Sequence, residues 1–299
     1  MALPINKKRA KGRDQVVAID LGSRTTKAVY LQRRGNGCVL NRFVIQDAPV
    51  YEKSLSPDLL AEHLKSVMQA LDTKAKSVVL ALGVSDSILR STELPLMPVP
   101  EMRLMLKHNS KNYLQQELPD HVFDCYIVPP RADGSQKEPV RGSQKYKVWV
   151  GAAKDRLLND IQAGTKAAGL VADQVTLSVL GPINAFEAAF PEIFAKEVVA
   201  LVDVGFKAST ISVLSEGELM LSRVVGIGGD KLTTGLAESI GVTYVEAEGI
   251  KIGMPHEVES SLQPLLSPLG RELRASIDFF EHQHDRTVGQ VYVSGGAAS

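Results

Sequence analysis

The chain has little cysteine and no excess of charge of either sign. Its 299 residues contain only Cys38 and Cys125, which lack metal-ligand spacing, so cysteine usage favours a reducing compartment over a disulfide framework. The 34 Lys and Arg residues equal the 34 Asp and Glu residues, so no overall field favours nucleic acid or membrane. We therefore expect no nucleic-acid partner.

Long hydrophobic runs are also missing. No segment approaches the roughly 20 consecutive apolar residues that span a bilayer. Residues 1–14 carry five cations but no apolar run follows them, so they are not a signal peptide. We expect residues 1–14 to be a disordered basic arm, for which anionic lipid is one candidate contact.

The stretch "VVAIDLGSRTTKAVYL" at 16–31 lacks the second glycine and the Lys-Ser/Thr ending of a P-loop. The residues after Gly22 favour strands, and "GNG" at 35–37 is a turn signal between two strands. Asp20 and Gly22 are therefore expected in the bend of a β-hairpin. This excludes the P-loop and Rossmann interpretations for the segment.

Residues 199–229 repeat this opening stretch without a gap at a shift of 183 positions, so that Asp20 aligns with Asp203 and Gly22 with Gly205. Both copies predict strand, Asp-x-Gly bend, strand, turn and strand, with an amphipathic helix later. The first helix is expected to start after Ser56 with Pro57 in its first turn, and the second to run from near Asp230 to Gly241. The chain is therefore predicted to be a duplicated α/β unit.

The segment between the copies is not explained by the duplication. A helix is expected from Pro100, strands at 123–128 and 147–153, and a mobile loop at 131–145, where apolar residues are scarce. The predicted organisation is a basic arm, a first repeat, an inserted α+β subdomain and a second repeat, at 1–14, 15–83, 84–170 and 171–299.

The motifs and their order resemble the actin, Hsp70 and sugar-kinase superfamily. Asp20-Leu-Gly-Ser is similar to its first phosphate motif and Asp203-Val-Gly-Phe to its second. "AEGIKIG" at 247–253 resembles the helix beside the nucleoside in bacterial actins, and "VYVSGG" at 291–296 resembles the adenosine motif. "LRSTELPLMPVPEMRLMLKHNSKNYLQQELP" is similar to the inserted subdomain of the PilM family of type IV pilus assembly proteins, relatives of FtsA and MreB. The resemblance implies a duplicated actin-like (ribonuclease H-like) fold.

Two Asp-x-Gly hairpins that face each other across a cleft can surround the phosphates of ATP with backbone amides. Asp20 and Asp203 are expected to hold Mg²⁺ largely through water. The predicted nucleotide-binding residues are Asp20, Gly22, Ser23, Thr25, Thr26, Lys27, Asp203, Gly205, Thr210, Gly228, Gly229, Glu248, Lys251, Gly295 and Gly296.

Each assignment has a purely structural alternative. A single Asp-x-Gly is usually only a turn, and Gly295-Gly296 at a strand end can be one too. Lys27 can simply face solvent, and Glu248 with Lys251 can be an ordinary pair on a helix surface.

Two features depart from the family pattern. The segment "LSVLGPINAF" at 177–186 has no carboxylate where active relatives orient the attacking water, so we expect at most slow ATP hydrolysis. The sequence also stops at "SGGAAS", where the family would continue, so we expect a truncated second repeat.

The resemblance implies a cytoplasmic ATP-binding protein at the inner face of the inner membrane. Its partner would be the N-terminal cytoplasmic tail of an inner-membrane protein such as PilN, bound in a nucleotide-sensitive way. The surface expected for this tail combines a strand and a helix and consists of Leu89, Met102, Arg103, Met105, Leu106 and Lys107. The alternative is that the methionines are ordinary core.

Two other functions stay open at this stage. One is a nucleotide-dead scaffold or filament former that associates with itself, and the other is a small-molecule kinase of the same superfamily.

Overall fold

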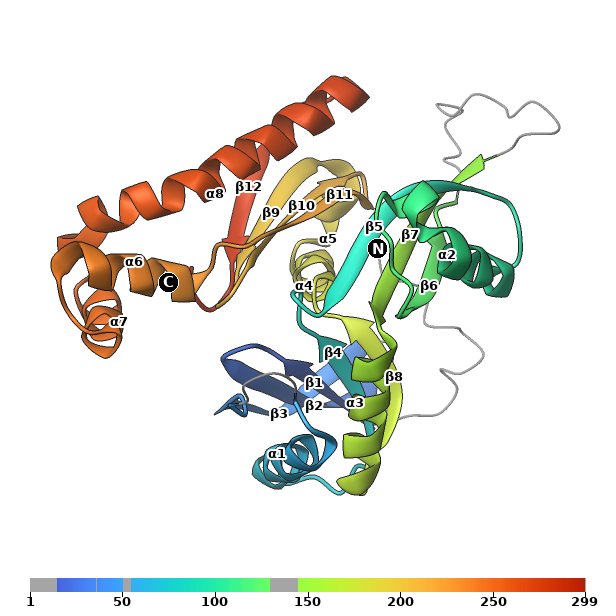
Figure 1. The fold of residues 1–299 in the computed structure, drawn as a ribbon, viewed down its shortest axis with the longest axis horizontal. Helices are drawn as coiled ribbons and strands as arrows, with labels where there is room; N and C mark the ends of the chain where they lie inside the picture. The colour runs from blue at the N-terminus through green and yellow to red at the C-terminus, as the bar shows by residue number, and fades with distance from the viewer. Residues whose placement is uncertain (1–14, 36, 51–54, 130–144, 299) are drawn as a thin grey trace. The chain divides into compact units, whose positions relative to one another are not determined.

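The computed structural model describes residues 15–35, 37–50, 55–129 and 145–298. The expected arm at 1–14 and nearly all of the expected loop at 131–145 lie outside these ranges. The described chain divides into two units, which meet in the sequence between Ser178 and Val179 (Figure 1). Among the described helices, none is both long and apolar enough to cross a membrane.

The first unit is built on a five-stranded sheet with the order β3-β2-β1-β4-β8. The strands β1 (Gln15–Leu21), β2 (Thr25–Arg34) and β3 (Gly37–Asp47) are antiparallel neighbours. The strands β4 (Ser77–Leu82) and β8 (Val171–Leu177) extend the sheet in parallel with β1. Crossover connections are required between these parallel strands, and helices supply them.

The helices α1 (Pro57–Ala70) and α3 (Asp155–Ala167) pack against each other in the core of this unit. The Ser56 hydroxyl accepts a hydrogen bond from the Leu59 amide and caps α1, as predicted. Gly164 permits the close approach of α3, because a Cβ there would lie 2.8 Å from the Pro57 carbonyl oxygen.

The inserted subdomain contains a three-stranded antiparallel sheet with the order β5-β7-β6. Its strands are β5 (Ser87–Pro95), β6 (His121–Ile127) and β7 (Lys145–Lys154). The helix α2 (Val99–Leu114) covers one face of this sheet and buries a cluster that includes Met102, Leu106, Phe123 and Val150. The subdomain therefore has its own hydrophobic core.

The domain boundary expected at residue 171 is wrong. The strand β8 pairs with β4 in the first sheet, and α3 packs on α1, so the chain returns to the first repeat directly after β7. Parallel pairing brings together segments about ninety residues apart, so no local sequence signal reveals it. The second repeat starts near Val179 instead.

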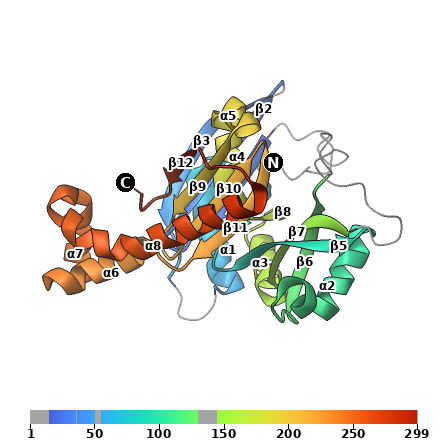
Figure 2. The ribbon, with the colours of Figure 1, turned by 90° about the horizontal axis from the view of Figure 1, so that it is seen from above.

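The second unit is built on a four-stranded sheet with the order β11-β10-β9-β12. Its strands are β9 (Val198–Val204), β10 (Ser209–Ser215), β11 (Glu218–Val225) and β12 (Gln290–Ser294). Its helices are α4 (Leu180–Ala189), α5 (Pro191–Lys196), α6 (Gly229–Ile240), α7 (Tyr244–Gly253) and α8 (Pro255–His284). The long α8 crosses this sheet and packs on it through Leu269 and Phe280 (Figure 2).

The predicted duplication is confirmed at the level of strand order. In both sheets the first strand of the repeat lies between its antiparallel hairpin partner and a later parallel strand. The shift of 183 positions relates both ends of β1 to both ends of β9. The copies differ in the next hairpin, because β2 and β3 have 10 and 11 residues while β10 and β11 have 7 and 8.

Candidate nucleotide-binding site

The Asp-x-Gly bend has the same backbone packing in both units. A Cβ on Gly22 would overlap the Thr25 carbonyl oxygen, and a Cβ on Gly205 would lie 2.7 Å from the Ala208 carbonyl oxygen. The Gly205 amide donates a hydrogen bond to that Ala208 oxygen at 3.1 Å. Each bend therefore requires glycine, since any side chain would force the backbone apart.

The two predicted metal carboxylates have different neighbours. Asp20 lies across the β1–β2 ladder from Lys27, whose Nζ is 3.9 Å from Asp20 Oδ2. This pair is solvent-exposed enough to be weak. Asp203 lies across from Thr210, and its Oδ1 accepts a hydrogen bond from Ser294 Oγ at 3.0 Å. Asp203 is thus tied to the end of β12, the predicted adenosine motif.

The prediction that Thr26 donates to phosphate is wrong, and Thr210, which was expected to support the second hairpin, is also too buried to reach a ligand. Thr26 is 1% exposed, and its hydroxyl lies 2.7 Å from Nε2 of His63 on α1. Thr210 is 3% exposed on β10, which is buried at every position. Strand alternation turns Thr26 to the core face with Ala28, whereas Ser23, Thr25 and Lys27 keep solvent-accessible side chains.

Three loops of the second unit meet through backbone contacts at the ends of β9, β11 and β12. A Cβ on Gly228 would overlap the Phe206 carbonyl oxygen and lie 2.6 Å from that of Gly205. Gly295 has φ +107°, and a Cβ there would lie 2.6 Å from the Val204 nitrogen. The loop after β9 therefore packs against the start of α6, and the last residue of β9 packs against the end of β12.

Hydrogen bonds hold these loops together. At the start of α6, the Gly229 amide donates to the Gly205 carbonyl oxygen and the Asp230 amide to that of Phe206, both at 2.9 Å. The Ala297 amide donates to the Val204 oxygen at 3.1 Å. The first amides of α6 thus bind protein carbonyls, so the glycines act here by allowing backbone to touch backbone. Gly296 has open space around it and no such requirement.

Glu248 and Lys251 on α7 form a partly buried network with Thr233 on α6. Lys251 Nζ lies 2.7 Å from Glu248 Oε2 and 2.7 Å from Thr233 Oγ1. The Glu248 and Lys251 side chains are each 15% exposed, and Thr233 is fully buried. An ordinary ion pair on a helix surface would be far more exposed. Glu248 and Lys251 are therefore not a simple surface pair.

Tyr244 and Asp230 belong to the same region and were not predicted from the sequence. The Tyr244 hydroxyl donates to Asp230 Oδ1 at 3.0 Å, and burial together with this hydrogen bond raises the pKa of Tyr244. The Thr243 hydroxyl and the Glu246 carboxylate form a capping box at the start of α7. The motif Thr-x-x-Glu at 243–246 could have indicated this residue from the sequence. It predicts that a helix begins after Thr243, which places Tyr244 at the first position of α7.

The donor set fits a magnesium–nucleotide complex better than a metal held by protein alone. Within the described residues, no three His, Cys, Asp or Glu side chains come together as a metal site. Asp20 and Asp203 lie in different units. Mg²⁺ at either carboxylate would take its other ligands from phosphate and water, which is its usual preference.

The six residues expected to form the partner surface do not lie together on one face of the inserted subdomain. Met102 and Leu106 are 0% exposed and lie in the subdomain core, so their assignment to a binding face is wrong. Leu94 and Ile88 of β5 also pack in that core, so strand alternation places Leu89 on the opposite face of the sheet. Arg103 and Lys107 are exposed on α2, where Arg103 pairs with Asp124 at 2.6 Å, and Met105 is half-buried.

Comparison with protein families gives one match over almost the whole chain. The family described as "Type IV pilus assembly protein PilM" matches residues 18–299. Cell division protein FtsA of Bacillus subtilis (strain 168) is 29% identical over 100 residues, which is 33% of this chain and 22% of FtsA. The chain thus matches only about a fifth of the length of that curated relative.

Solved structures share the fold. The PilM–PilN type IV pilus biogenesis complex superposes with a TM-score of 0.79 at 23% identity and covers 96% of this chain and 83% of that chain. MreB5 of Spiroplasma citri bound to ADP gives a TM-score of 0.50 at 11% identity over 95% and 85% of the chains. The predicted actin-like fold is confirmed.

The contact between His63 and Thr26 predicts a pH-dependent stability. Burial lowers the pKa of His63 below 6.5, so the unfolded chain takes up a proton first as the pH falls. This contribution to the free energy of unfolding is present above pH 6.5 and lost between pH 6.5 and the lower folded-state pKa. Urea unfolding of His63→Gln should therefore depend less on pH in this window than that of the wild type. His108→Gln, at an exposed position of α2, is the control, and equal pH dependence of His63→Gln and wild type would contradict the prediction.

Proposed function

Because the chain belongs to the type IV pilus assembly protein PilM family, we propose that it is an ATP-binding protein that acts in type IV pilus assembly and binds the cytoplasmic tail of an inner-membrane protein. It would work in the cytoplasm, at the inner face of the inner membrane. The buried network of Glu248, Lys251 and Thr233 beside the glycine loops of the second unit is the observation that carries the nucleotide part.

This network suits a ribose. Its carboxylate accepts hydrogen bonds and its ammonium group donates them, and both are held in place before a ligand arrives. Lys251 Nζ would lie 3.9 Å from a Cβ on Gly229, so the network adjoins the point where α6 begins. The ADP named with MreB5 supports an adenine nucleotide on this fold.

The two hairpin bends are the proposed phosphate-binding elements. Asp20 and Asp203 would bind Mg²⁺ through its waters, and the ion would neutralise phosphate charge. Ser23, Thr25 and Lys27 have accessible side chains that would donate to phosphate. Gly22 and Gly205 keep each bend free of a side chain.

We propose that hydrolysis of this ATP is slow. Helix α4, which follows the first unit, has no acidic residue in its first turn and begins with Leu180, Gly181 and Pro182. Phosphoryl transfer to water needs a group that orients the nucleophile, and α4 does not supply a carboxylate at its start. ATP would then act mainly as a bound ligand that biases partner binding.

The partner site is proposed on the inserted subdomain, on the sheet face opposite α2. The PilN chain named in the matched complex suggests a partner of that kind. Strand β5 is an edge strand, and an extended peptide can pair with such an edge while placing side chains beside Leu89. The exposed residues Ser91 and Glu93 lie on the same face as Leu89.

Asparagine substitution of the bend carboxylates tests the nucleotide proposal. Asp203→Asn and Asp20→Asn should each weaken Mg²⁺–ATP binding roughly tenfold or more, because a charge directed at the ion is lost. Titration with a fluorescent ATP analogue measures the affinity. When Mg²⁺ is chelated, the affinities of the variants and of the wild type should differ little. Asp278→Asn on the exposed side of α8 is the matched control. Wild-type affinity in both bend variants would contradict the site, and a wild type that binds no ATP would favour the nucleotide-free scaffold.

Substitutions on the two sides of the inserted subdomain test the partner site. Leu89→Ala and Ser91→Arg should weaken binding of a cognate N-terminal tail peptide about tenfold or more, since both alter the proposed face. Leu104→Ala, on the exposed side of α2, should leave peptide affinity unchanged. Fluorescence anisotropy of the labelled peptide measures both. If Leu104→Ala or Lys107→Glu weakens binding and Ser91→Arg does not, the tail binds α2 instead.

A further inference from the structure

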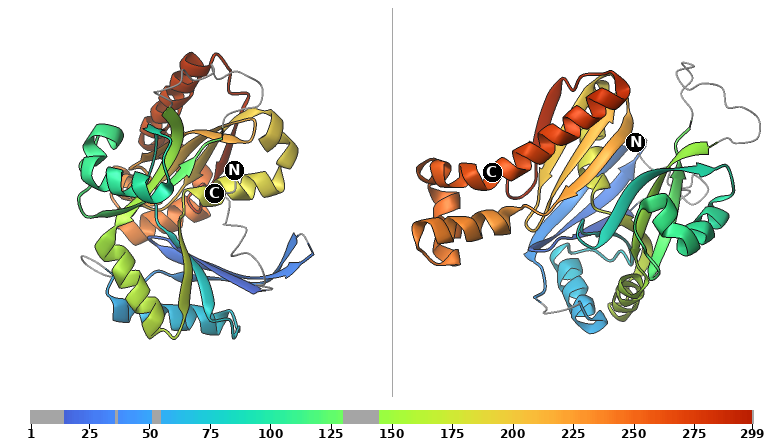
Figure 3. Two further views of the ribbon diagram at one scale, coloured as in Figure 1. Left: turned by 90° about the vertical axis from the view of Figure 1, so that its right-hand side faces the viewer. Right: turned by 45° about the horizontal axis from the view of Figure 1, so that its top comes forward.

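Helix α8 joins two parts of the second unit that have separate hydrophobic cores. Its first residues pack with α6 and α7 through Val258 and Leu262, and from Leu269 onward it packs on the sheet. Figure 3 shows α6 and α7 at one end of α8, while the rest of α8 crosses the sheet. We call α6, α7 and residues 255–262 the helical part, and the sheet with residues 269–284 the sheet part.

Few connections set the angle between these two parts. Among the described residues, no side chain belongs both to the hydrophobic cluster of the helical part and to a cluster of the sheet part. The chain passes between the parts twice, from β11 to α6 through Gly226 and Gly228, and back along α8 through 263–268. The angle between the parts is therefore set chiefly by these two connections.

Two prolines weaken the connection along α8. Pro264 and Pro268 lie inside the helix, and neither has an amide hydrogen. The carbonyl groups of Ser260 and Pro264 therefore cannot accept the usual hydrogen bond from the residue four positions later. Prolines in a helix interior are the commonest cause of a bend, so α8 resists bending least at this point.

The weak segment coincides with the border between the two cores. The Ser267 hydroxyl donates to the Gln263 carbonyl oxygen at 3.0 Å, and bonds of this kind favour bending of a helix. Leu262 is the last residue of α8 in the core of the helical part, and Leu269 is the first in the core of the sheet part. Residues 263–268 thus lie between the cores and belong to neither.

The other connection holds α6 at its start. The amides of Gly229 and Asp230 are bonded to carbonyl oxygens of the bend after β9, so this end of α6 is tied to the sheet part. Further along α6, a Cβ on Gly235 would lie 2.6 Å from Leu265 Cδ2, so α6 also contacts the proline segment of α8. The helical part can therefore tilt about a line through the start of α6 and residues 263–268.

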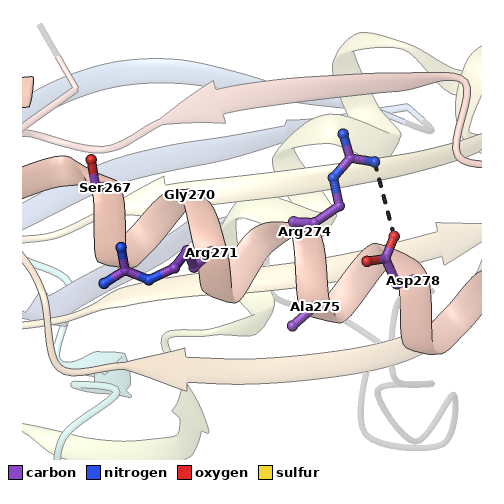
Figure 4. A pocket seen from close by; sticks show the side chains of 6 residues that line it. All are labelled: Ser267, Gly270, Arg271, Arg274, Ala275 and Asp278. Atoms are coloured by element: carbon purple, nitrogen blue, oxygen red, sulfur yellow. Dashed lines mark ion pairs between the residues drawn. The ribbon is translucent and has the colours of Figure 1, made fainter.

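Beyond the prolines, α8 is fixed to the sheet. Leu269, Leu273 and Phe280 pack on β9, β10 and β11. One exposed side of this half carries Ser267, Gly270, Arg271, Arg274, Ala275 and Asp278 (Figure 4). Arg274 lies 3.9 Å from Asp278, one helical turn further on. This half of α8 would therefore keep its place while the helical part tilts.

We propose that residues 263–268 are a hinge about which the helical part closes on the sheet part when a nucleotide binds. Lys251 of the helical part and Ala297 after β12 both lie beside Gly229, with Nζ and Cβ at 3.9 and 2.9 Å from a Cβ placed there. A ligand held by the Lys251 network and by the loop at 295–297 would draw the two parts together. The ligand in this inference rests on the proposed nucleotide site, whereas the hinge can be measured without nucleotide.

Pulsed electron spin resonance of the full chain measures the tilt. One spin label is attached to the helical part at Val245→Cys, where the native side chain is 79% exposed. The other is attached at Ala195→Cys, an exposed position of α5. Helix α5 is held to the turn between β10 and β11, because the Gly217 amide donates to the Phe194 carbonyl oxygen at 2.7 Å.

The native cysteines allow selective labelling. Cys38→Ser removes the exposed thiol from the labelled parent protein. Burial, followed by the charge of Asp124, raises the pKa of Cys125 to about 11, so this thiol reacts slowly at neutral pH.

Pro264→Ala/Pro268→Ala is the decisive variant. Without nucleotide, it should narrow the distribution of distances between the labels roughly twofold, because alanine amides restore both missing bonds. Mg²⁺–ATP should shift the distribution of the parent and shift that of the variant less. The variant should also bind ATP roughly threefold more weakly or worse, since tilting now breaks helical bonds. Thermal unfolding should show the variant to be at least as stable as the parent.

Pro255→Ala is the matched control. Pro255 is in the first turn of α8, where an amide has no partner within the helix. Its replacement should leave the distance distribution and the ATP affinity unchanged.

Equal widths for the parent and for Pro264→Ala/Pro268→Ala without nucleotide, or an equal effect of Pro255→Ala, would overturn the hinge. An ATP-induced shift that is the same in the parent and in Pro264→Ala/Pro268→Ala would overturn it as well. A parent protein that binds no ATP would instead contradict the proposed nucleotide site, and the widths without nucleotide would still decide whether the hinge exists.

Discussion

Direct contact of backbone with backbone at the ends of β9, β11 and β12 is the constraint on which the proposed site depends. No Cβ fits at Gly205, Gly228 or Gly295, because the loop after β9 touches the start of α6 and the last residue of β9 touches the end of β12. This packing sets where α6 begins. Helix α6 carries Thr233, whose hydroxyl accepts a hydrogen bond from Lys251 on α7. The residues proposed to bind phosphate and ribose are thus positioned by glycines that need contact no ligand themselves.

The Asp-x-Gly bend occurs in both repeats, but the residues around it differ. Gly22 and Gly205 occupy equivalent bends and face the carbonyl oxygens of Thr25 and Ala208. Across the ladder from the aspartate, the first copy has Lys27 and the second has the buried Thr210. The first copy also has the longer hairpin and is followed by the inserted subdomain.

Local signals predicted much of this architecture, and non-local packing accounts for what they missed. The Asp-x-Gly bends, the Ser56 cap and the end of α6 at Gly241 depend on residues near in sequence, and each was found. The return of α3 and β8 to the first sheet depends on pairing with distant β4. Periodicity placed Met102 and Leu106 on one side of α2 but did not distinguish a core from a binding face. Likewise, a threonine in a bend motif gave no indication that Thr26 would face His63.

Hydrogen exchange of the full chain, measured by mass spectrometry with and without Mg²⁺–ATP, tests the central claim most directly. A nucleotide held by the glycine-packed loops should slow amide exchange at 20–26, 203–208, 228–233, 244–251 and 294–298, because it stabilises the loops against local opening. Exchange in α2, which has its own core, should not change. No slowing in the segments from 203 onward, at ATP concentrations that saturate binding, would contradict the account.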